Sequence, residues 1–291
     1  MLGAAAASPG FWDWSFDPPL VLVADLAILY WLGDRRTVTP RRTRVAQRWR
    51  SASFYLALFV LAVALASPIE RLSAELFWVH MIQHVLLLVV AAPLFVLARP
   101  WIRLWRCLPL NARRWLARKL SQSDGMASVR FVSRTLGRPV PSFLLFSVVL
   151  LAWHVPALFD ATLRSTALHA LEHTLFFCAA IMFWKQVIPS PPLRARLMAA
   201  QRVVYAIGGM TVSWVLAVVL AVAPHPLYSF YAHQTSRPGG ISAIADQQLA
   251  AGIMWVPGSI TFLIVVFIYV HRWLMEPEPS AARTARLAGE H

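Results

Sequence analysis

The sequence predicts an all-α integral membrane protein, a bundle of seven transmembrane helices with its N-terminus outside and its C-terminus in the cytoplasm. Composition is the first observation: the 291 residues are 58% hydrophobic and 14% charged, whereas soluble domains are roughly 45–50% apolar and 25% charged. In water, such a chain would lack the polar side chains to cover its surface. The second observation is that its apolar residues form runs of about 20, the length of a helix that crosses a bilayer.

Seven apolar runs are long enough to be membrane spans. The first is the weakest, because it is short and contains the carboxylate of Asp25. Without it the chain would have six spans and a cytoplasmic N-terminus, and the other spans would keep their orientation. The predicted spans are residues 16–33, 51–67, 76–97, 140–158, 168–188, 203–223 and 248–269.

The basic residues indicate the orientation of these spans. The net charge is +14, and 24 of the 27 Lys and Arg residues lie in alternate loops or in the C-terminal tail. Only Arg71, Arg164 and Arg237 lie on the other side. Cytoplasmic loops carry such an excess of positive charge, so the basic side is the cytoplasm. A nucleic-acid-binding protein would gather its cations on one face of a folded domain, and no nucleic-acid partner is expected.

We expect residues 1–275 to form a single transmembrane domain. Its longest cytoplasmic loop, 99–139, contains a stretch at 99–120 in which Trp101, Trp105 and Trp115 alternate with arginines. This pattern predicts an amphipathic helix on the membrane surface, with partner docking as the alternative. Residues 276–291 are rich in Pro, Ala and charge, which predicts a disordered cytoplasmic tail. Residues 1–10 lack the basic start of a cleaved signal peptide.

Five histidines are predicted to lie in one layer near the outer end of the bundle. Taking a rise of about 1.5 Å per residue, His80 and His84 stand roughly 5 and 10 Å below the start of the third span. His169 and His173 have a similar depth in the fifth span, and His154 lies roughly 6 Å from the outer surface at the end of the fourth. Two more histidines lie in the loop above this layer, His225 and His233.

This layer has the chemistry of a metal site. His80 and His84 are spaced i, i+4, as are His169 and His173. This spacing places both imidazoles of a pair on one helix face about 6 Å apart. Neutral imidazole binds copper, zinc, iron and nickel, and Glu172 could bind the same ion or orient an imidazole. A single histidine near a membrane interface usually serves as an anchor or as a hydrogen-bonding partner between helices. Five in one layer favour a metal or haem role, because buried ionisable groups in membranes are costly. The isolated Cys107 and Cys178 argue against thiolate ligation or a disulfide framework.

The seventh span offers further polar groups at the same depth. Met254 could be a soft ligand for copper(I) or a packing residue, and Gln247 lies seven residues earlier on the same helix face. Asp246 could join the site or cap its own helix. Asp25 in the first span could also face the same cavity.

These residues resemble the CtaG-type cytochrome c oxidase assembly factors, a family of seven-span bacterial membrane proteins. No single motif is specific to this family, but the complete set of motifs in this order and spacing is. Where the family often has paired glycines, this chain has Ala251-Gly252, which alters packing but no candidate ligand. The motifs are His80-x3-His84, Trp153-His154-x-Pro156, His169-x2-Glu172-His173, Asp246-Gln247-Gln248, Gly252 and Met254-Trp255-x-Pro257.

The resemblance implies an assembly factor that helps to mature a haem-copper oxidase in the bacterial cytoplasmic (inner) membrane by supplying copper. The chain would be a chaperone rather than an enzyme, and no nucleophile with an adjacent base is apparent. Its expected partners are oxidase subunits, the lipid bilayer and a soluble extracytoplasmic copper chaperone. Copper is the expected metal, and zinc is an alternative by ligand type. The candidate ligands are His80, His84, His154, His169, His173, Glu172, Asp246 and Met254.

Two other functions are compatible with the same residues. Histidines at matched depth on separate helices could hold haem b in a membrane cytochrome, although i, i+4 neighbours on one helix cannot bind one iron from opposite sides. A copper permease is the other alternative. Transporters usually bind near the midplane, and here few ionisable groups lie deeper than the histidine layer, so no path across the membrane is visible.

Overall fold

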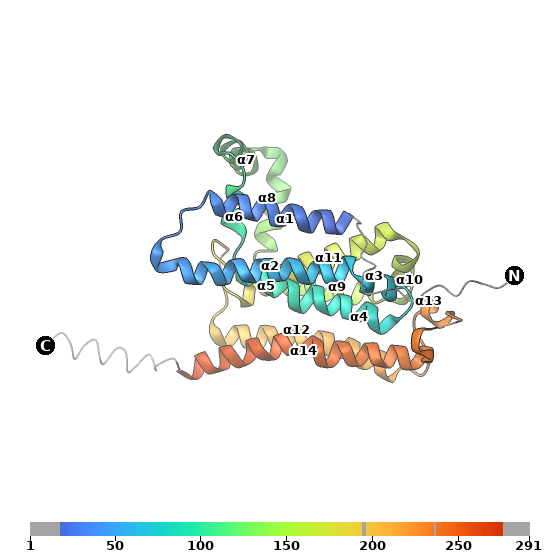
Figure 1. The fold of residues 1–291 in the computed structure, drawn as a ribbon. Helices are drawn as coiled ribbons and strands as arrows, with labels where there is room; N and C mark the ends of the chain where they lie inside the picture. The colour runs from blue at the N-terminus through green and yellow to red at the C-terminus, as the bar shows by residue number, and fades with distance from the viewer. Residues whose placement is uncertain (1–17, 194–195, 236, 276–291) are drawn as a thin grey trace.

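The computed structural model describes residues 18–193, 196–235 and 237–275. These residues form helices and connecting loops without a β-strand, which confirms the all-α class. Figure 1 shows α12 and α14 side by side along one edge of the bundle and α1 along the opposite edge. The predictions for the N-terminal segment before residue 18 and for the tail at 276–291 lie outside the described residues.

The long helices are joined by short helices and turns. The first half of the chain contains α1 (Pro18–Arg35), α2 (Arg44–Ala66), α3 (Pro68–Ser73), α4 (Phe77–Val85), a π-helix (Leu86–Ala91), α5 (Ala92–Ala98), α6 (Trp101–Arg106), α7 (Leu110–Gln122) and α8 (Ala127–Thr135). The second half contains α9 (Pro139–Trp153), α10 (Pro156–Arg164), α11 (Thr166–Val187), α12 (Ala199–Val222), α13 (Ser229–Ala232) and α14 (Ala243–Met275). Three short 3-10 turns complete the described part, at Arg41–Thr43, Asp124–Met126 and Pro238–Gly240.

Several of these helices can cross a membrane, as a multi-pass membrane protein requires. Five are long and apolar enough, namely Arg41–Ala66, Phe77–Ala98, Thr166–Val187, Ala199–Val222 and Ala243–Met275. A sixth span results if Asp124–Thr135 and α9, which meet at 90°, are counted as one. The first predicted span is a helix, α1, but it carries Asp25, Asp34 and Arg35 within 18 residues. With these three charges it is not among the helices that are apolar enough to cross a membrane.

The fourth predicted span, 140–158, is wrong as a continuous helix. Helix α9 ends at Trp153, His154 is its C-cap, and Val155 has an extended backbone with φ −65° and ψ 126°. The cause is Pro156, because a proline disfavours the helical conformation of the residue before it and is favoured at the start of the next helix. His154 therefore lies at a break between α9 and α10.

The predicted surface helix at 99–120 is also two elements. Arg99 has a left-handed backbone with φ 52°, α6 ends at Arg106, and α7 begins only after Pro109. Helix α6 packs into the bundle: a Cβ at Gly33 of α1 would lie 1.9 Å from the Arg103 carbonyl oxygen. The buried Arg103 guanidinium forms an ion pair of 2.5 Å with Asp34. Unlike α6, α7 has no buried residue, and Figure 1 shows it standing out from the bundle with α8.

A π-helix interrupts the third span directly below His84. Wider π-turns leave backbone carbonyls without their usual partners, and such turns are frequent at functional sites. Here the Trp184 indole of α11 donates to the Leu88 carbonyl at 2.7 Å, and the Thr261 hydroxyl of α14 donates to the Val89 carbonyl at 2.5 Å. Two neighbouring helices are thus anchored to the span that carries His80 and His84.

Candidate metal centre

The five histidines predicted to share a layer meet in one cluster. His80 and His84 project from α4, His169 and His173 from α11, and His154 from the break after α9. Figure 1 places α3, α4, α10 and α13 at this end of the bundle. Neighbouring rings lie 4.2 Å (His169–His173), 4.5 Å (His80–His84), 5.1 Å (His80–His169) and 5.7 Å (His84–His154) apart between centroids. All are buried except His169, which is half-buried.

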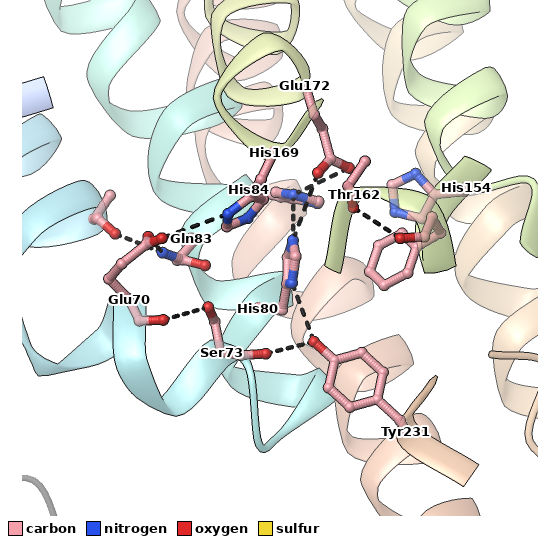
Figure 2. Close-up of polar contacts among 12 residues, drawn as sticks. Glu70, Ser73, His80, Gln83, His84, His154, Thr162, His169, Glu172 and Tyr231 are labelled. Atoms are coloured by element: carbon pink, nitrogen blue, oxygen red, sulfur yellow. Dashed lines mark hydrogen bonds and ion pairs between the residues drawn. The ribbon is translucent and has the colours of Figure 1, made fainter. Parts of the chain in front are cut away.

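Four of the residues form a compact ligand group. His80, His169, Glu172 and His173 each offer a nitrogen or oxygen atom within 4.8 Å of the others. The Glu172 side chain is fully buried, with Oε2 3.9 Å from His80 Nε2 and Oε1 3.6 Å from His84 Nε2. Figure 2 shows this carboxylate directed at both imidazoles. Three imidazoles and one carboxylate make a donor set that suits copper, zinc or iron.

Several buried ligand atoms of the cluster have no hydrogen-bond partner. Both Glu172 oxygens lack one, and the neighbouring Thr162 hydroxyl donates to the Phe159 carbonyl instead. Buried polar atoms are nearly always hydrogen-bonded, and an unpaired one costs about 1–3 kcal/mol. The residues present therefore fit a metal ion, which would accept their lone pairs together. The unpaired nitrogens are His84 Nδ1, His154 Nε2, His169 Nε2 and His173 Nε2.

Polar contacts on the outer side of the rings orient three of the imidazoles. His154 Nδ1 lies 2.8 Å from the Leu150 carbonyl oxygen, and His169 Nδ1 lies 3.4 Å from Glu70 Oε1. Because a carbonyl can only accept, His154 Nδ1 carries the ring proton and Nε2 keeps its lone pair. Metal-binding histidines typically use the second nitrogen in this way, which fixes the tautomer and the ring orientation.

Tyr231 has the corresponding role for His80. Its hydroxyl donates to the Ser73 carbonyl and lies 3.1 Å from His80 Nδ1. Burial, followed by the nearby carboxylates, raises the pKa of the Tyr231 phenol well above its ordinary value, so the phenol keeps its proton. Since that proton is directed to Ser73, His80 Nδ1 must donate to the phenol oxygen. His80 Nε2 then keeps its lone pair for a ligand.

Aromatic rings close the cluster against water. Phe159 of α10 packs on His80 and His154 with centroid distances of 5.0 and 6.0 Å. Phe176 of α11 packs on His84 at 4.6 Å. Phe77 and Tyr228 pack against Phe159 at 5.5 and 4.3 Å and extend the covering. Exclusion of water strengthens the electrostatic interactions inside such a site.

Two of the predicted residues in the seventh span hold the surroundings in place. Asp246 accepts hydrogen bonds from the amides of Phe77 (3.0 Å) and Trp78 (2.9 Å), and so caps the N-terminus of α4 rather than of its own helix. Gln247 accepts from the Leu227 amide at 2.7 Å and donates to the Leu220 carbonyl at 3.0 Å.

The remaining candidates are divided between the site and the surface. Met254 lines a cavity of about 30 Å³ together with His84 and His154. The idea that Asp25 faces the cluster is wrong, because Asp25 is exposed on α1, which packs against α2 and α6. The loop histidines His225 and His233 are exposed as well.

Two supporting residues, Glu70 and Tyr231, were not predicted. Glu70 of α3 accepts a hydrogen bond of 2.5 Å from Gln83 Nε2, besides facing His169. An acidic residue in the short outer connection before the third span is the signal that could have identified it. Tyr231 is 151 residues from His80 in the chain, and nothing local in the sequence connects the two.

Together these features define a multi-pass membrane protein with a buried histidine–carboxylate centre near one end of its bundle. The chain belongs to the cytochrome c oxidase caa3 assembly factor family, whose sequence profile matches residues 28–276. The family membership predicted from the ordered motifs is confirmed.

The chain also resembles curated mycobacterial proteins. Uncharacterized proteins of Mycobacterium bovis and Mycobacterium tuberculosis are each 24% identical over 229 residues, which is 76% of this chain and 33% of the relative. An uncharacterized protein of Mycobacterium leprae is 23% identical over 288 residues, covering 96% of this chain and 42% of the relative. The chain therefore spans about a third to two fifths of the length of these relatives. No solved structure matches the chain significantly.

Proposed function

We propose that this protein assists assembly of a haem-copper cytochrome c oxidase by binding copper at its histidine cluster and supplying it. Membership of the family provides the link to oxidase assembly. The compact group of His80, His169, Glu172 and His173, with ligand atoms within 4.8 Å of one another, is the observation that carries the metal-binding part. The protein is a carrier rather than an enzyme.

The packing of the cluster favours a metal ion over haem b. The His80 and His84 Nε2 atoms are 3.0 Å apart and face the same space. A porphyrin held by two axial histidines needs a flat gap between rings on opposite sides. Rings with centroids 4.2–6.1 Å apart leave no such gap.

The surroundings of the cluster favour a binding protein over a permease. Below the cluster the lining of the small cavity is mostly apolar and includes Val85, Leu88 and Phe146. Transport of a charged ion would need polar groups along a path to the other side. Copper has the highest affinity for nitrogen and oxygen donor sets among the divalent first-row metals, and the histidine-rich group matches that preference.

We place the cluster at the extracytoplasmic side of the bacterial inner membrane. The positive charges of the loops at the opposite end support this orientation, and they belong with seven spans in a single domain of residues 1–275, an N-terminus outside and a cytoplasmic C-terminus. An extracytoplasmic site could receive copper from a soluble chaperone and pass it to an oxidase subunit. The loop at 99–139, with α7 exposed, would then lie on the inner leaflet.

Metal analysis tests this proposal directly. Detergent-purified wild-type protein should contain near-stoichiometric copper and show no Soret band, whereas the His80→Ala/His84→Ala variant should lose the copper. A matched control is His225→Ala/His233→Ala, which removes two exposed histidines and should retain the metal. A Soret band would identify a cytochrome instead, and wild-type protein that neither retains nor takes up copper would contradict the proposal.

A further inference from the structure

The cluster contains more donors than one ion uses. The compact group of His80, His169, Glu172 and His173 is complete without His84 and His154. These two imidazoles are nevertheless buried, with 2% and 5% of their surface exposed. Each has an unpaired nitrogen, Nδ1 in His84 and Nε2 in His154. A purely structural histidine in a membrane core would have both nitrogens occupied or facing water.

The two leftover imidazoles share a cavity with a sulfur donor. The cavity of about 30 Å³ is lined by His84 and His154 and by Met254 of α14, which is 6% exposed. The only other polar residue of its lining is Ser213, whose hydroxyl donates to the Gly209 carbonyl at 3.3 Å. The donors available around this space are therefore two imidazole nitrogens and one thioether.

This donor set differs in chemistry from the compact group. A thioether is a soft ligand that selects copper(I), whereas a carboxylate is hard and neutral imidazole serves both. The mostly apolar lining also disfavours a higher ionic charge, because desolvation costs rise with charge. The cavity consequently suits copper(I) better than zinc or copper(II).

His84 links the two donor sets. Its Nε2 faces the compact group, 3.6 Å from Glu172 Oε1 and 3.0 Å from His80 Nε2. Since His80 Nε2 carries no proton, His84 Nε2 donates the hydrogen bond between them, and His84 Nδ1 keeps its lone pair. The two donor sets are then separated by a single imidazole ring.

We propose that His84 Nδ1, His154 Nε2 and the Met254 thioether form a second, copper(I)-selective subsite next to the compact group. This inference rests on the proposed copper function and adds a second position for the ion. Copper(I) would move between the two positions by exchange of ligands without a change of oxidation state. Such an arrangement suits a protein that hands an ion on rather than storing it.

The test is an anaerobic titration of the purified full-length protein with copper(I) against a chromophoric copper(I) chelator. Wild type should bind two equivalents and take up only one of zinc. Met254→Leu keeps the side-chain volume and should weaken the second equivalent at least tenfold while the first is unchanged. The matched control is Met210→Leu, since Met210 is also 6% exposed but lies outside the cavity lining. X-ray absorption should detect a sulfur neighbour of copper that Met254→Leu alone removes.

The outcomes separate the two proposals. A single equivalent that survives Met254→Leu and His154→Ala but is lost in His173→Ala would overturn the second subsite and leave the proposed function standing. Loss of both equivalents in a folded Met254→Leu protein would place Met254 in one common site, which also overturns it. Wild type that binds no copper(I) would overturn the second subsite, and wild type that takes up copper in neither oxidation state would overturn both proposals.

Discussion

At the scale of single residues, the partner of each Nδ1 atom determines the tautomer of the imidazole and so whether Nε2 has a lone pair for a metal ion. His154 faces a backbone carbonyl and His169 faces the Glu70 carboxylate, and both of these groups accept hydrogen bonds. His80 faces a phenol, which can donate or accept. The tautomer of His80 therefore depends on a second bond, from Tyr231 to Ser73.

Replacing Tyr231 with Phe should weaken copper binding without unfolding the protein. The change removes the oxygen that accepts from His80 Nδ1, and loss of such an orienting partner typically costs 10–100-fold, roughly, in metal affinity. Competition with a chelator measures the effect. Tyr228→Phe is the control, because Tyr228 donates to the backbone oxygen of His154 rather than to an imidazole. Equal losses in both variants would attribute the effect to packing of the loop.

Glu172→Gln should separate stability from binding. The buried carboxylate has no hydrogen bond, so its neutral isostere should leave the metal-free protein as stable or raise its Tm. Without the negative charge the variant should lose most of the Tm increase that copper gives to wild type, because a ligand stabilises the state that binds it. Thermal unfolding with and without copper tests both effects. A metal-free variant that is clearly less stable than wild type would show that Glu172 has a structural partner.

The site residues on single helices could be predicted from the sequence, and those that meet across the fold could not. His80 and His84, like His169 and His173, are one helical turn apart, so their proximity follows from helix geometry alone. Tyr231 and Glu70 reach the cluster only because α13 and α3 fold over it. The role of Asp246 has the same origin, since its partners lie 169 and 168 residues away.

At the scale of secondary structure, the cap on α4 holds the helix that presents His80 and His84. Asp246→Asn retains one acceptor oxygen for the two amides and should cost about 0.5–1.5 kcal/mol, the usual net contribution of one hydrogen bond. Part of that loss should appear as weaker copper binding, because His80 lies within the first turns of α4. Thermal unfolding and copper titration measure the two parts. Asp25→Asn on the exposed face of α1 is the control and should change neither.

The extent of a helix could be predicted from hydropathy where the length of its apolar run is sufficient to define it. Hydropathy correctly indicated the core of α2, α11 and α12, whose apolar length is sufficient by itself. It missed the break at His154, where Pro156 acts on the residue before it. It also missed the π-helix after His84, which depends on donors from Trp184 and Thr261 on other helices.

At the scale of the whole molecule, the cluster exists only when separate parts of the chain are packed together. Its candidate ligands come from α4, α11 and the break between α9 and α10, and its supporting groups come from α3, α13 and α14. Metal binding should therefore depend on the complete bundle. The energetics of the first helix decide how many times that bundle crosses the membrane.

The free energy of inserting α1 into the membrane is the sum of opposing contributions. A carboxylate at the centre of a membrane helix costs about 2.5–3.5 kcal/mol, and each Leu, Ile or Val contributes roughly 0.3–0.6 kcal/mol. Helix α1 contains eight such residues besides Asp25, so the two contributions nearly cancel. The ion pair between Asp34 and Arg103 and the close contact at Gly33 fasten α1 to α6. These contacts favour a spanning α1 and seven crossings.

Cysteine labelling with a membrane-impermeant maleimide tests this topology. In a Cys107→Ser/Cys178→Ser background, a cysteine at the exposed position of His225 should be labelled in intact cells, and one at Ser121 on α7 only after permeabilisation. Ser8→Cys should be labelled in intact cells if α1 crosses the membrane. Labelling of Ser8→Cys only after permeabilisation would reduce the count to six. Intact-cell labelling at Ser121 instead of His225 would invert the bundle and place the histidine cluster at the cytoplasmic side, away from any extracytoplasmic source of copper.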